Sequence, residues 1–443
     1  MKDVLLLHGY NVTSTKTYGV LPQRLKSLGY NVKNVYLSKY VTLDDDLTLA
    51  DIVRGFQAAL IDVYGPKFES HEFACITHST GGLVARAWID KYYGARMKAL
   101  PMTHLIMLAP PNNGSRLANL GKSKLSRLRS ILGVEPGLRI LDDLELGSAF
   151  QWDLNSSWMR KKIHHADGFY PFVIMGQWVD KKMWDVLAPA TYERGSDGVV
   201  RVAAANLNMQ KFTIHSNGTK PLHEVMQATA FYVAPKASHT GDDFGIMMGI
   251  PSKGEHPVLS AIDAALRVKD KKSYVALETD FALKTRETQQ NEPFYDGSPL
   301  NRYCQLVFRI TDDAGNNLTD YAIELIDGDR RGDKLPSGFA GHHHRNEARL
   351  ERFIFYLNWD LLSKVPGGKL GFRVNAATGT ALVEYPVFEF LGSVSDVSMF
   401  LKPNQTTFVD VVLKRRLNKN VFRLTKNLSY QKIDGKAGDE WID

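Results

Sequence analysis

Short apolar runs alternate with amphipathic stretches through the first 270 residues of the chain. The apolar runs are typical of buried β-strands, and the stretches between the earlier runs have helical spacing. Alternation of this kind predicts an α/β fold, a doubly wound and mostly parallel sheet with helices on both faces. The expected strands lie near residues 3–9, 31–38, 72–78, 104–110, 170–176 and 228–235.

The pattern changes at the polar break 269–273. Beyond it, strand-like runs are separated by turn-forming residues, and short strands at this spacing predict a β-sandwich. We therefore expect an α/β domain over 1–270, an accessory β-sandwich domain over 274–426 and a loosely held polar tail over 427–443. The expected strands of the second domain lie at 274–283, 304–311, 321–326, 353–357, 370–374, 381–390 and 406–413.

The segment 73–82 has the pattern of a strand that runs directly into a turn and a helix. Ser79 lies on the turn, with Thr77 two residues before it and Gly81 two residues after it. On such a nucleophile elbow the serine hydroxyl is exposed at the sheet edge and at the start of a helix, and small flanking residues let strand and helix approach closely. Thr77 stands where glycine is usual, so the motif is relaxed at one position.

A second motif, His8-Gly9-Tyr10, ends the first apolar run. Acyl-transfer chemistry needs two backbone N–H groups aimed at the developing oxyanion, one from the residue after the nucleophile and one from the loop after an early strand. We expect these donors to be Thr80 and Tyr10, with Gly9 leaving room for the substrate oxygen.

These two motifs, together with the apolar run and Pro-x-x-Gly-Ser loop at 108–115, resemble the bacterial lipases of the α/β-hydrolase superfamily. The resemblance covers about residues 1–260. It implies a serine esterase whose nucleophile, acid and base follow in the order Ser, Asp or Glu, His. It also implies a cap or lid, which we expect as an insertion over about 112–165.

The loop 195–200 is similar to the Asn-Asp-Gly-hydrophobic loop that carries the catalytic aspartate in these lipases, which makes Asp197 the expected acid. The same Asp-Gly pair is also typical of a simple turn between strands. Asp180 and Asp185 lie closer to the end of the preceding strand and remain alternatives.

His239 follows the last expected strand by a few residues, where the superfamily places its histidine. His223, before a helix-like stretch at 224–226, is the alternative, and His215 is expected at the surface. By the logic of the Ser-His-Asp triad, Ser79 would attack the ester carbonyl and His239 would take its proton. Asp197 would fix the imidazole tautomer.

Composition is ordinary for a globular chain of 443 residues, with 44% hydrophobic and 23% charged residues. No run of about 18 apolar residues predicts a membrane span. A cleavable signal peptide would remove the expected oxyanion loop, so we expect a cytoplasmic protein, or one exported by a system that needs no signal peptide. Cys75 and Cys304 are the only cysteines, which argues against a disulfide framework.

The net charge of +7 and the pI near 9.0 favour anionic partners. A basic cluster within a leucine-rich segment predicts peripheral contact with an anionic membrane, although an ordinary surface helix has the same pattern. The chain has no phosphate-binding glycine loop and no alternation of aromatic and basic residues, so nucleic acid is not expected. The cluster consists of Lys122, Lys124, Arg127 and Arg129.

No cofactor and no metal ion are expected. Residues 342–344 are three successive histidines, but neighbours on an extended chain point to opposite faces, so a solvated loop is the preferred interpretation. Asp242 and Asp243 lie near His239, and a structural calcium ion there stays open.

The sequence thus predicts a serine ester hydrolase, a lipase or phospholipase that cleaves acyl lipids through an acyl-enzyme. A short-chain carboxylesterase, a polyester depolymerase and an acyltransferase are alternatives within enzymes. The alternative that is not an enzyme is a binding protein on a degenerate hydrolase scaffold, whose β-domain would bind a protein partner. The architecture also resembles antibacterial phospholipase effectors, which is an analogy of fold only.

Overall fold

The computed structural model describes residues 2–7, 18–35, 46–118, 138–161, 163, 168–179, 193–294, 296–418 and 441–442. The chain divides into two compact units, which we call the α/β unit and the β unit. The α/β unit contains Met1–Met209, Val225–Gln305 and Pro403–Thr406. The β unit contains Gln210–Glu224, Leu306–Lys402 and Thr407–Asp443.

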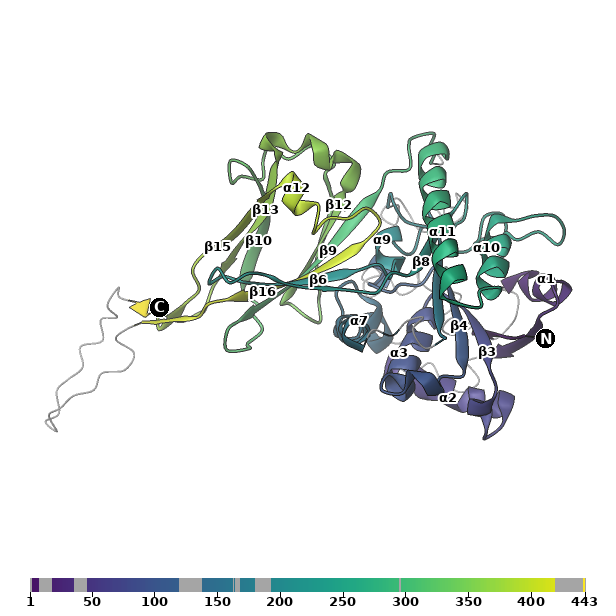
Figure 1. Ribbon diagram of the computed structural model, residues 1–443. Coiled ribbons are helices and arrows are strands. Elements are labelled where there is room, and N and C mark those ends of the chain that lie inside the picture. The colour runs from purple at the N-terminus through teal and green to yellow at the C-terminus, as the bar shows by residue number, and fades with distance from the viewer. Residues whose placement is uncertain are drawn as a thin grey trace, which may run out of the picture. The chain divides into compact units, whose positions relative to one another are not determined.

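A six-stranded sheet with the strand order β2-β1-β3-β4-β5-β8 forms the centre of the α/β unit (Figure 1). Each neighbouring pair in this sheet is parallel, which confirms the predicted fold class. The other strands are mostly buried and apolar, as expected for a sheet covered on both faces, whereas the edge strand β2 is only partly buried. The strands are β1 (Asp3–Leu7), β2 (Asn31–Val35), β3 (Phe73–His78), β4 (Met102–Leu108), β5 (Tyr170–Gly176) and β8 (Ala230–Ala234).

Helices follow the strands of this sheet, and their starts can be read from local chemistry. Thr48 caps α2 in a capping box with Asp51, which satisfies backbone N–H groups at the helix start. The apolar face of α2 then packs on α3, where Trp88 contacts Phe56 and donates to Gln57 Oε1 at 2.7 Å. The helices of the unit are α1 (Leu21–Ser27), α2 (Leu49–Tyr64), α3 (Gly81–Tyr93), α6 (Leu138–Leu144), α7 (Ala149–Lys161), α9 (Val202–Ala205), α10 (Pro257–Leu266) and α11 (Lys271–Asn291), with 3₁₀ turns at Phe68–Ser70 and Met97–Ala99.

The strand predicted over 274–283 is wrong, because this segment lies inside α11. Its buried residues Tyr274, Phe281 and Thr285 follow helical spacing along one face. That face covers the edge strand β8: the Ala230 N–H donates to the Tyr274 hydroxyl at 3.1 Å, and the Val233 N–H donates to Thr285 Oγ1 at 2.9 Å. Side chains of α11 thus replace a further strand, and the segment after residue 270 still belongs to the α/β unit.

The β unit contains a six-stranded sheet, β11-β12-β9-β16-β6-β7, and a three-stranded sheet, β10-β13-β15. A smaller three-stranded sheet has the order β14-β17-β18. Their strands are β6 (Gln210–His215), β7 (Leu222–Val225), β9 (Tyr303–Asp312), β10 (Tyr321–Asp327), β11 (Ala340–Arg345), β12 (Arg352–Asn358), β13 (Lys369–Ala376), β14 (Val383–Glu384), β15 (Phe388–Ser393), β16 (Thr406–Leu413), β17 (Arg416–Asn418) and β18 (Trp441–Ile442). The unit also has the helix α12 (Val394–Val397) and 3₁₀ turns at Trp359–Lys364 and Pro366–Gly368.

Several expectations for this part of the chain need correction. The hairpin of β6 and β7 was expected within the α/β domain, yet β6 pairs in parallel with β16 of the β unit. The stretch expected to be helical at 224–226 includes the end of β7. Residues 342–344 lie in the edge strand β11 instead of a loop, and residues 441–442 of the expected loose tail pair with β17. The place of β6 is decided by a pairing with a segment almost 200 residues away, and the other points by pairings between neighbouring strands or segments.

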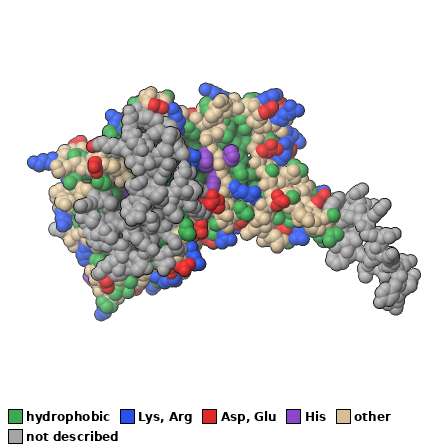
Figure 2. Space-filling model, turned by 180° about the vertical axis from the view of Figure 1, so that it is seen from behind, with side chains coloured by type: hydrophobic (Ala, Val, Ile, Leu, Met, Phe, Trp, Pro, Cys, Tyr) green, Lys and Arg blue, Asp and Glu red, His purple; other side chains and the backbone are tan. Residues whose placement is uncertain are grey.

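Within the described ranges, no helix is long and apolar enough to cross a membrane. Cys75 and Cys304 are both buried free thiols, and burial raises the pKa of Cys304 to about 12. Figure 2 shows acidic and basic side chains interspersed over the displayed face. The basic cluster predicted to contact a membrane lies outside the described residues.

Burial of a histidine in β4 makes the fold sensitive to acid. His104 Nε2 donates to the Val268 carbonyl at 2.9 Å, and Lys2 Nζ lies 2.9 Å from His104 Nδ1. Burial, aided by the Lys2 charge, lowers the pKa of His104 from 6.5 to about 3. Between these two pH values His104 binds a proton in the unfolded chain but not in the folded one. Its effect on stability is therefore absent above about pH 6.5, and it lowers the unfolding free energy increasingly as the pH falls toward 3.

We expect His104 to contribute a loss of up to about 1.4 kcal/mol in unfolding free energy for each pH unit within that window. His104→Phe removes the titrating group, and its unfolding free energy should change less than that of the unaltered chain between about pH 7 and 5. Urea unfolding of both proteins at the two pH values measures the difference. Equal pH dependence in the two proteins would contradict this assignment.

Candidate active site

Ser79 occupies a strained turn between β3 and α3. Its φ of 52° lies in the left-handed region, which is costly for a residue with a side chain and recurs at functional sites. The turn is fixed on both sides, since the Ser79 N–H donates to the Leu108 carbonyl at 2.9 Å and the Ser79 carbonyl accepts from Gly82 at 3.0 Å. A Cβ on Gly82 would lie 2.9 Å from Pro110 Cβ. The absence of a side chain at Gly82 therefore lets the start of α3 approach the end of β4 and the loop that follows it.

The structure brings Ser79, His239 and Asp197 into one hydrogen-bonded series. His239 Nε2 lies 3.1 Å from Ser79 Oγ, and His239 Nδ1 lies 2.8 Å from Asp197 Oδ2. Both His239 and Asp197 are buried. An imidazole that carries its proton on Nδ1 donates to the carboxylate and leaves Nε2 free to accept from the serine hydroxyl, which is the arrangement a general base requires.

The Asp197 carboxylate is aimed by its own turn. Its Oδ1 accepts hydrogen bonds from the Val199 and Val200 N–H groups at 2.9 and 2.8 Å, which leaves Oδ2 to face His239. The backbone contributes as well, because the His239 N–H donates to the Asp197 carbonyl at 3.0 Å. The Asp-Gly pair thus lies in a bend closed by an isolated bridge between Ser196 and Arg201, not in a turn between two strands, and this bend orients the carboxylate.

A buried ion pair closes the loop that carries Asp197. Arg201 Nε and Nη2 donate to the two carboxylate oxygens of Glu193, each at 2.8 Å, and Arg201 Nη1 donates to Gln305 Oε1 at 2.9 Å. Arg201 is 1% exposed, so this charge is held almost without solvent. Glu193 precedes Asp197 and Arg201 follows it, so the ion pair joins the two ends of the loop. The sequence analysis did not predict the pair, because the spacing of these two residues is the same as that of ordinary charged residues at a surface.

The loop that carries His239 is held against the elbow. His78, which precedes the nucleophile, has its Nε2 3.1 Å from the His239 carbonyl, and the two rings lie 4.8 Å apart. At the end of β5, a Cβ on Gly176 would lie 1.8 Å from the Ala237 carbonyl oxygen. A glycine at this position lets the loop approach the sheet. The His78 contact therefore joins the serine turn to the loop that carries His239.

A cavity of about 390 Å³, which includes space open to solvent, begins at Ser79. Thr80 and Ser115 are its other polar lining residues, and the Ser115 hydroxyl is already donated to the Val199 carbonyl at 2.7 Å. Thr80 is the N-cap of α3, where the first backbone N–H groups have no acceptor within the helix. The remaining lining is apolar and consists of Pro111, Leu117, Ala118, Leu141, Leu144, Val199 and Val200.

A buried arginine supports the loop that forms one wall of this cavity. Arg86 of α3 donates to Asn112 Oδ1 at 3.0 Å and to Asn155 Oδ1 at 2.7 Å, and its guanidinium lies over the Trp158 ring. Burial lowers the pKa of Arg86 to about 9, so it stays protonated at neutral pH. Asn155 also donates to Asn113 Oδ1 at 2.9 Å. Residues of the segment expected to form the cap are therefore joined to α3 by polar contacts that the sequence did not predict.

The other candidates from the sequence lie elsewhere. His223 lies in β7, where its Nε2 contacts Gln210 Oε1 at 3.0 Å, and His215 lies in β6. Tyr10, Asp180 and Asp185 fall outside the described residues, as does the central part of the expected cap. Among the residues that the structure describes, no group of three or more His, Cys, Asp or Glu side chains is placed to hold a metal ion.

Comparison with known proteins gives one clear result. Neither the family models nor the curated proteins contain a match. Among solved structures, phospholipase PlaB from Legionella pneumophila is 37% identical to this chain, with a TM-score of 0.91 over 100% of this chain and 99% of that one. The chain belongs to the PlaB family. A second structure, PlaB in complex with thio-NAD, matches at 37% identity and a TM-score of 0.90 over the full length of both chains.

Membership in the PlaB family confirms the resemblance to lipases of the α/β-hydrolase superfamily and extends it over the whole chain, including the β unit. The protein is a carboxylic ester hydrolase of the lipase type. The serine turn, the buried histidine and the apolar cavity are features that such chemistry uses.

The Glu193–Arg201 pair generates a prediction about this hydrolase. Glu193→Gln leaves Arg201 as a buried charge without a carboxylate, which should lower the unfolding free energy by about 3 kcal/mol. Because the Asp197 loop then loosens, we also expect kcat to fall more than KM changes. Chemical denaturation and ester hydrolysis measure the two effects.

The matched control is Asp280→Asn, which removes the carboxylate of an exposed pair with Lys284. An exposed pair of this kind contributes about 0–1 kcal/mol. Similar losses of stability and of kcat in the two variants would show that the buried pair does not position the loop.

Proposed function

We propose that this protein is a phospholipase that cleaves the acyl esters of membrane lipids, with Ser79 as nucleophile, His239 as general base and acid, and Asp197 as the residue that orients His239. The observation that carries the proposal is the continuous series of contacts from Ser79 Oγ through the imidazole to the Asp197 carboxylate, at 3.1 and 2.8 Å. A degenerate, non-catalytic scaffold has no reason to retain a strained serine turn together with this series.

In the first half of the reaction, Ser79 Oγ attacks the ester carbonyl carbon while His239 Nε2 takes the hydroxyl proton. The carbonyl oxygen becomes negative and is held by backbone N–H groups, one of them that of Thr80 at the positive end of α3. The tetrahedral intermediate collapses as the bond to the alcohol breaks and His239 gives that alcohol its proton. The acyl group now remains on Ser79.

In the second half, a water molecule takes the place of the alcohol. His239 removes one proton as the water oxygen attacks the acyl carbon, and returns it to Ser79 Oγ when the acyl bond breaks. The products are a fatty acid and the free enzyme. Asp197 keeps its negative charge throughout and stabilises the imidazolium in both halves.

A lipid substrate is supported by the cavity beside Ser79, whose walls beyond the reacting end are apolar. An acyl chain bound there removes hydrocarbon from water and needs no hydrogen-bond partner. The head group would then lie toward solvent. A phospholipid in particular is supported because the Legionella relative is a phospholipase. The basic segment at 122–129, expected to contact an anionic membrane, agrees with this class of substrate.

The experiment that tests the proposal compares the unaltered chain with Ser79→Ala on mixed phospholipid liposomes and on soluble p-nitrophenyl esters. We expect fatty acid release from liposomes by the unaltered chain and a loss of about a thousandfold or more in Ser79→Ala. Turnover of short soluble esters alone would make the protein a carboxylesterase. Release of an acylated alcohol in place of fatty acid would make it an acyltransferase, and equal rates in both proteins would remove the assigned nucleophile.

The cavity wall gives a second prediction. Leu144 of α6 lines the cavity, and Leu144→Phe should shorten the space for the acyl chain. We expect kcat/KM for a long-chain ester to fall by about tenfold relative to a butanoyl ester, because one methylene in an apolar pocket contributes roughly 1–3 kcal/mol. The ratio of the two substrates is independent of the amount of folded enzyme. An unchanged ratio would place the acyl chain elsewhere.

A further inference from the structure

The backbone of His239 is held at both of its hydrogen-bonding groups. Its N–H donates to the Asp197 carbonyl at 3.0 Å, and its carbonyl oxygen lies 3.1 Å from His78 Nε2. The imidazole of the same residue contacts Asp197 Oδ2 and Ser79 Oγ. Each side-chain contact of the proposed triad is therefore accompanied by a backbone link, and His78, the residue before the nucleophile, supplies one of them.

The contact from His78 has a defined direction. A carbonyl oxygen can only accept a hydrogen bond, so His78 Nε2 carries a proton and donates it to the His239 carbonyl. The two imidazole rings also lie 4.8 Å apart, with their planes inclined at 45°. His78 thus offers the loop both a directed N–H donor and the packing of a flat ring. Substitution can separate the two, because glutamine retains a donor and phenylalanine retains a ring.

Three contacts attach the loop that carries His239 to different parts of the α/β unit. Trp178, two residues after the end of β5, donates its N–H to the Ala237 carbonyl at 3.1 Å. The N–H of His239 attaches the loop to Asp197. The contact from His78 attaches it to the serine turn. The distance between the imidazole and the nucleophile therefore depends on the last of these contacts.

That distance leaves little room for movement. Ser79 Oγ lies 3.1 Å from His239 Nε2, close to the upper end of the roughly 2.6–3.2 Å from which a general base removes a proton. A shift of the loop by about 1 Å would exceed this range, and a misplacement of that size costs about a hundredfold in rate. Ser79 cannot follow such a shift, because the Leu108 carbonyl holds its N–H.

We propose that His78 is a positioning residue for the hydrolysis, and that the Nε2–H it donates to the His239 carbonyl sets the distance between Ser79 Oγ and the imidazole. His78 and Ser79 are consecutive residues at the end of β3, so the donor and the nucleophile move as one unit. This role rests on the proposed function only in so far as Ser79 is the nucleophile and His239 the base, and it holds for any acyl ester. His78 takes no proton during the reaction.

The matched variants His78→Gln and His78→Phe test the proposal with p-nitrophenyl butanoate as substrate. Glutamine places an amide N–H about where His78 Nε2 lies, whereas phenylalanine keeps a ring without a donor. We expect kcat of His78→Gln to stay within about threefold of the unaltered chain, and kcat of His78→Phe to fall by about ten- to a hundredfold. KM should change little in both variants, because His78 does not line the cavity beside Ser79.

Labelling by a fluorophosphonate gives a second measurement that needs no ester substrate. Ser79 Oγ bonds to phosphorus, fluoride leaves, and His239 takes the hydroxyl proton, so the labelling rate should follow kcat across the variants. His71→Phe makes the same change at an exposed histidine and should leave both rates unaltered. If His78→Phe does not fold, His78→Asn replaces it. Its amide is one bond shorter than that of glutamine, so we expect the loss found without a donor.

Three results would overturn the role of His78. Retained kcat in His78→Phe with a loss in His78→Gln would show that the site uses the ring and not the donor. Equal rates in all variants would remove His78 from the site. Losses in both variants as large as that of His239→Ala would make His78 part of the proton transfer itself.

Failure of the phospholipase proposal has a different signature. Butanoate hydrolysis that depends on Ser79, without fatty acid release from liposomes, would contradict a phospholipid substrate while the comparison of His78 variants still decides their role. An absence of both hydrolysis and Ser79 labelling in the unaltered chain would overturn the two proposals together.

Discussion

The left-handed turn at Ser79 is the constraint on which the rest of the α/β unit depends. A side chain in this conformation is unfavourable by about 1–3 kcal/mol, so the surrounding structure must hold it. The Leu108 carbonyl on one side and the packing of Gly82 against Pro110 on the other supply that restraint. As a result, the Ser79 hydroxyl lies beyond the end of β3 and faces His239. The loop that carries His239 can approach the sheet only because β5 ends in Gly176.

Buried polar groups surround this turn and set the geometry of the site. Arg86 and Arg201 are each fully buried, a costly arrangement for a cation unless its donors are satisfied. Arg201 has the Glu193 carboxylate, whereas Arg86 has asparagine oxygens at its two terminal nitrogens and the Trp158 ring, and its Nε has no hydrogen-bond partner among the described residues. Each joins segments that are distant in sequence, so they hold in place the loops that carry Asp197 and the cavity wall. Such networks specify one arrangement of loops because partial pairing is so unfavourable.

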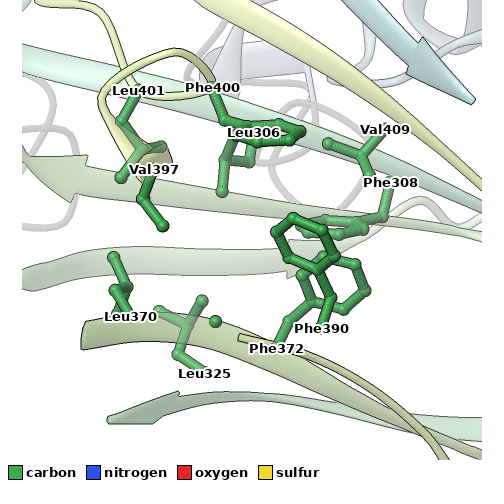
Figure 3. Close-up of a pocket in the computed structure, with 11 residues that line it drawn as sticks. Leu306, Phe308, Leu325, Leu370, Phe372, Phe390, Val397, Phe400, Leu401 and Val409 are labelled. Atoms are coloured by element: carbon green, nitrogen blue, oxygen red, sulfur yellow. The ribbon is translucent and has the colours of Figure 1, made fainter. Parts of the chain in front are cut away.

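The β unit is assembled from three separate stretches of chain. Its central sheet pairs β16 with β6, which comes from the middle of the α/β sequence, so neither unit is a continuous segment. The two larger sheets meet through aromatic contacts such as Phe308 with Phe372 at 4.9 Å. Where these aromatic layers are imperfectly filled, a small apolar gap remains, with Phe308 and Val409 facing Leu325 and Phe372 across it (Figure 3). Pairing of segments so far apart in sequence requires the closure of long loops, which has an entropic cost and slows the formation of such a sheet.

The sequence by itself determined the parallel α/β sheet and predicted the serine turn, and its resemblance to lipases put forward Asp197 and His239 while Asp180, Asp185 and His223 stayed open. Each of these depends on local pattern: apolar runs of strand length, a Ser between small residues, an Asp-Gly turn and a histidine just after a strand. Tertiary structure alone decided that residues 271–291 form a helix on the edge of β8, that β6 and β7 leave the α/β unit, and that Glu193 pairs with Arg201. The first two outcomes depend on partners tens to hundreds of residues away, and the burial of the Glu193–Arg201 pair depends on the loop around it and on Gln305. The hydrophobic periodicity of a segment, or a charged residue within it, does not show which other part of the chain will pack against that segment.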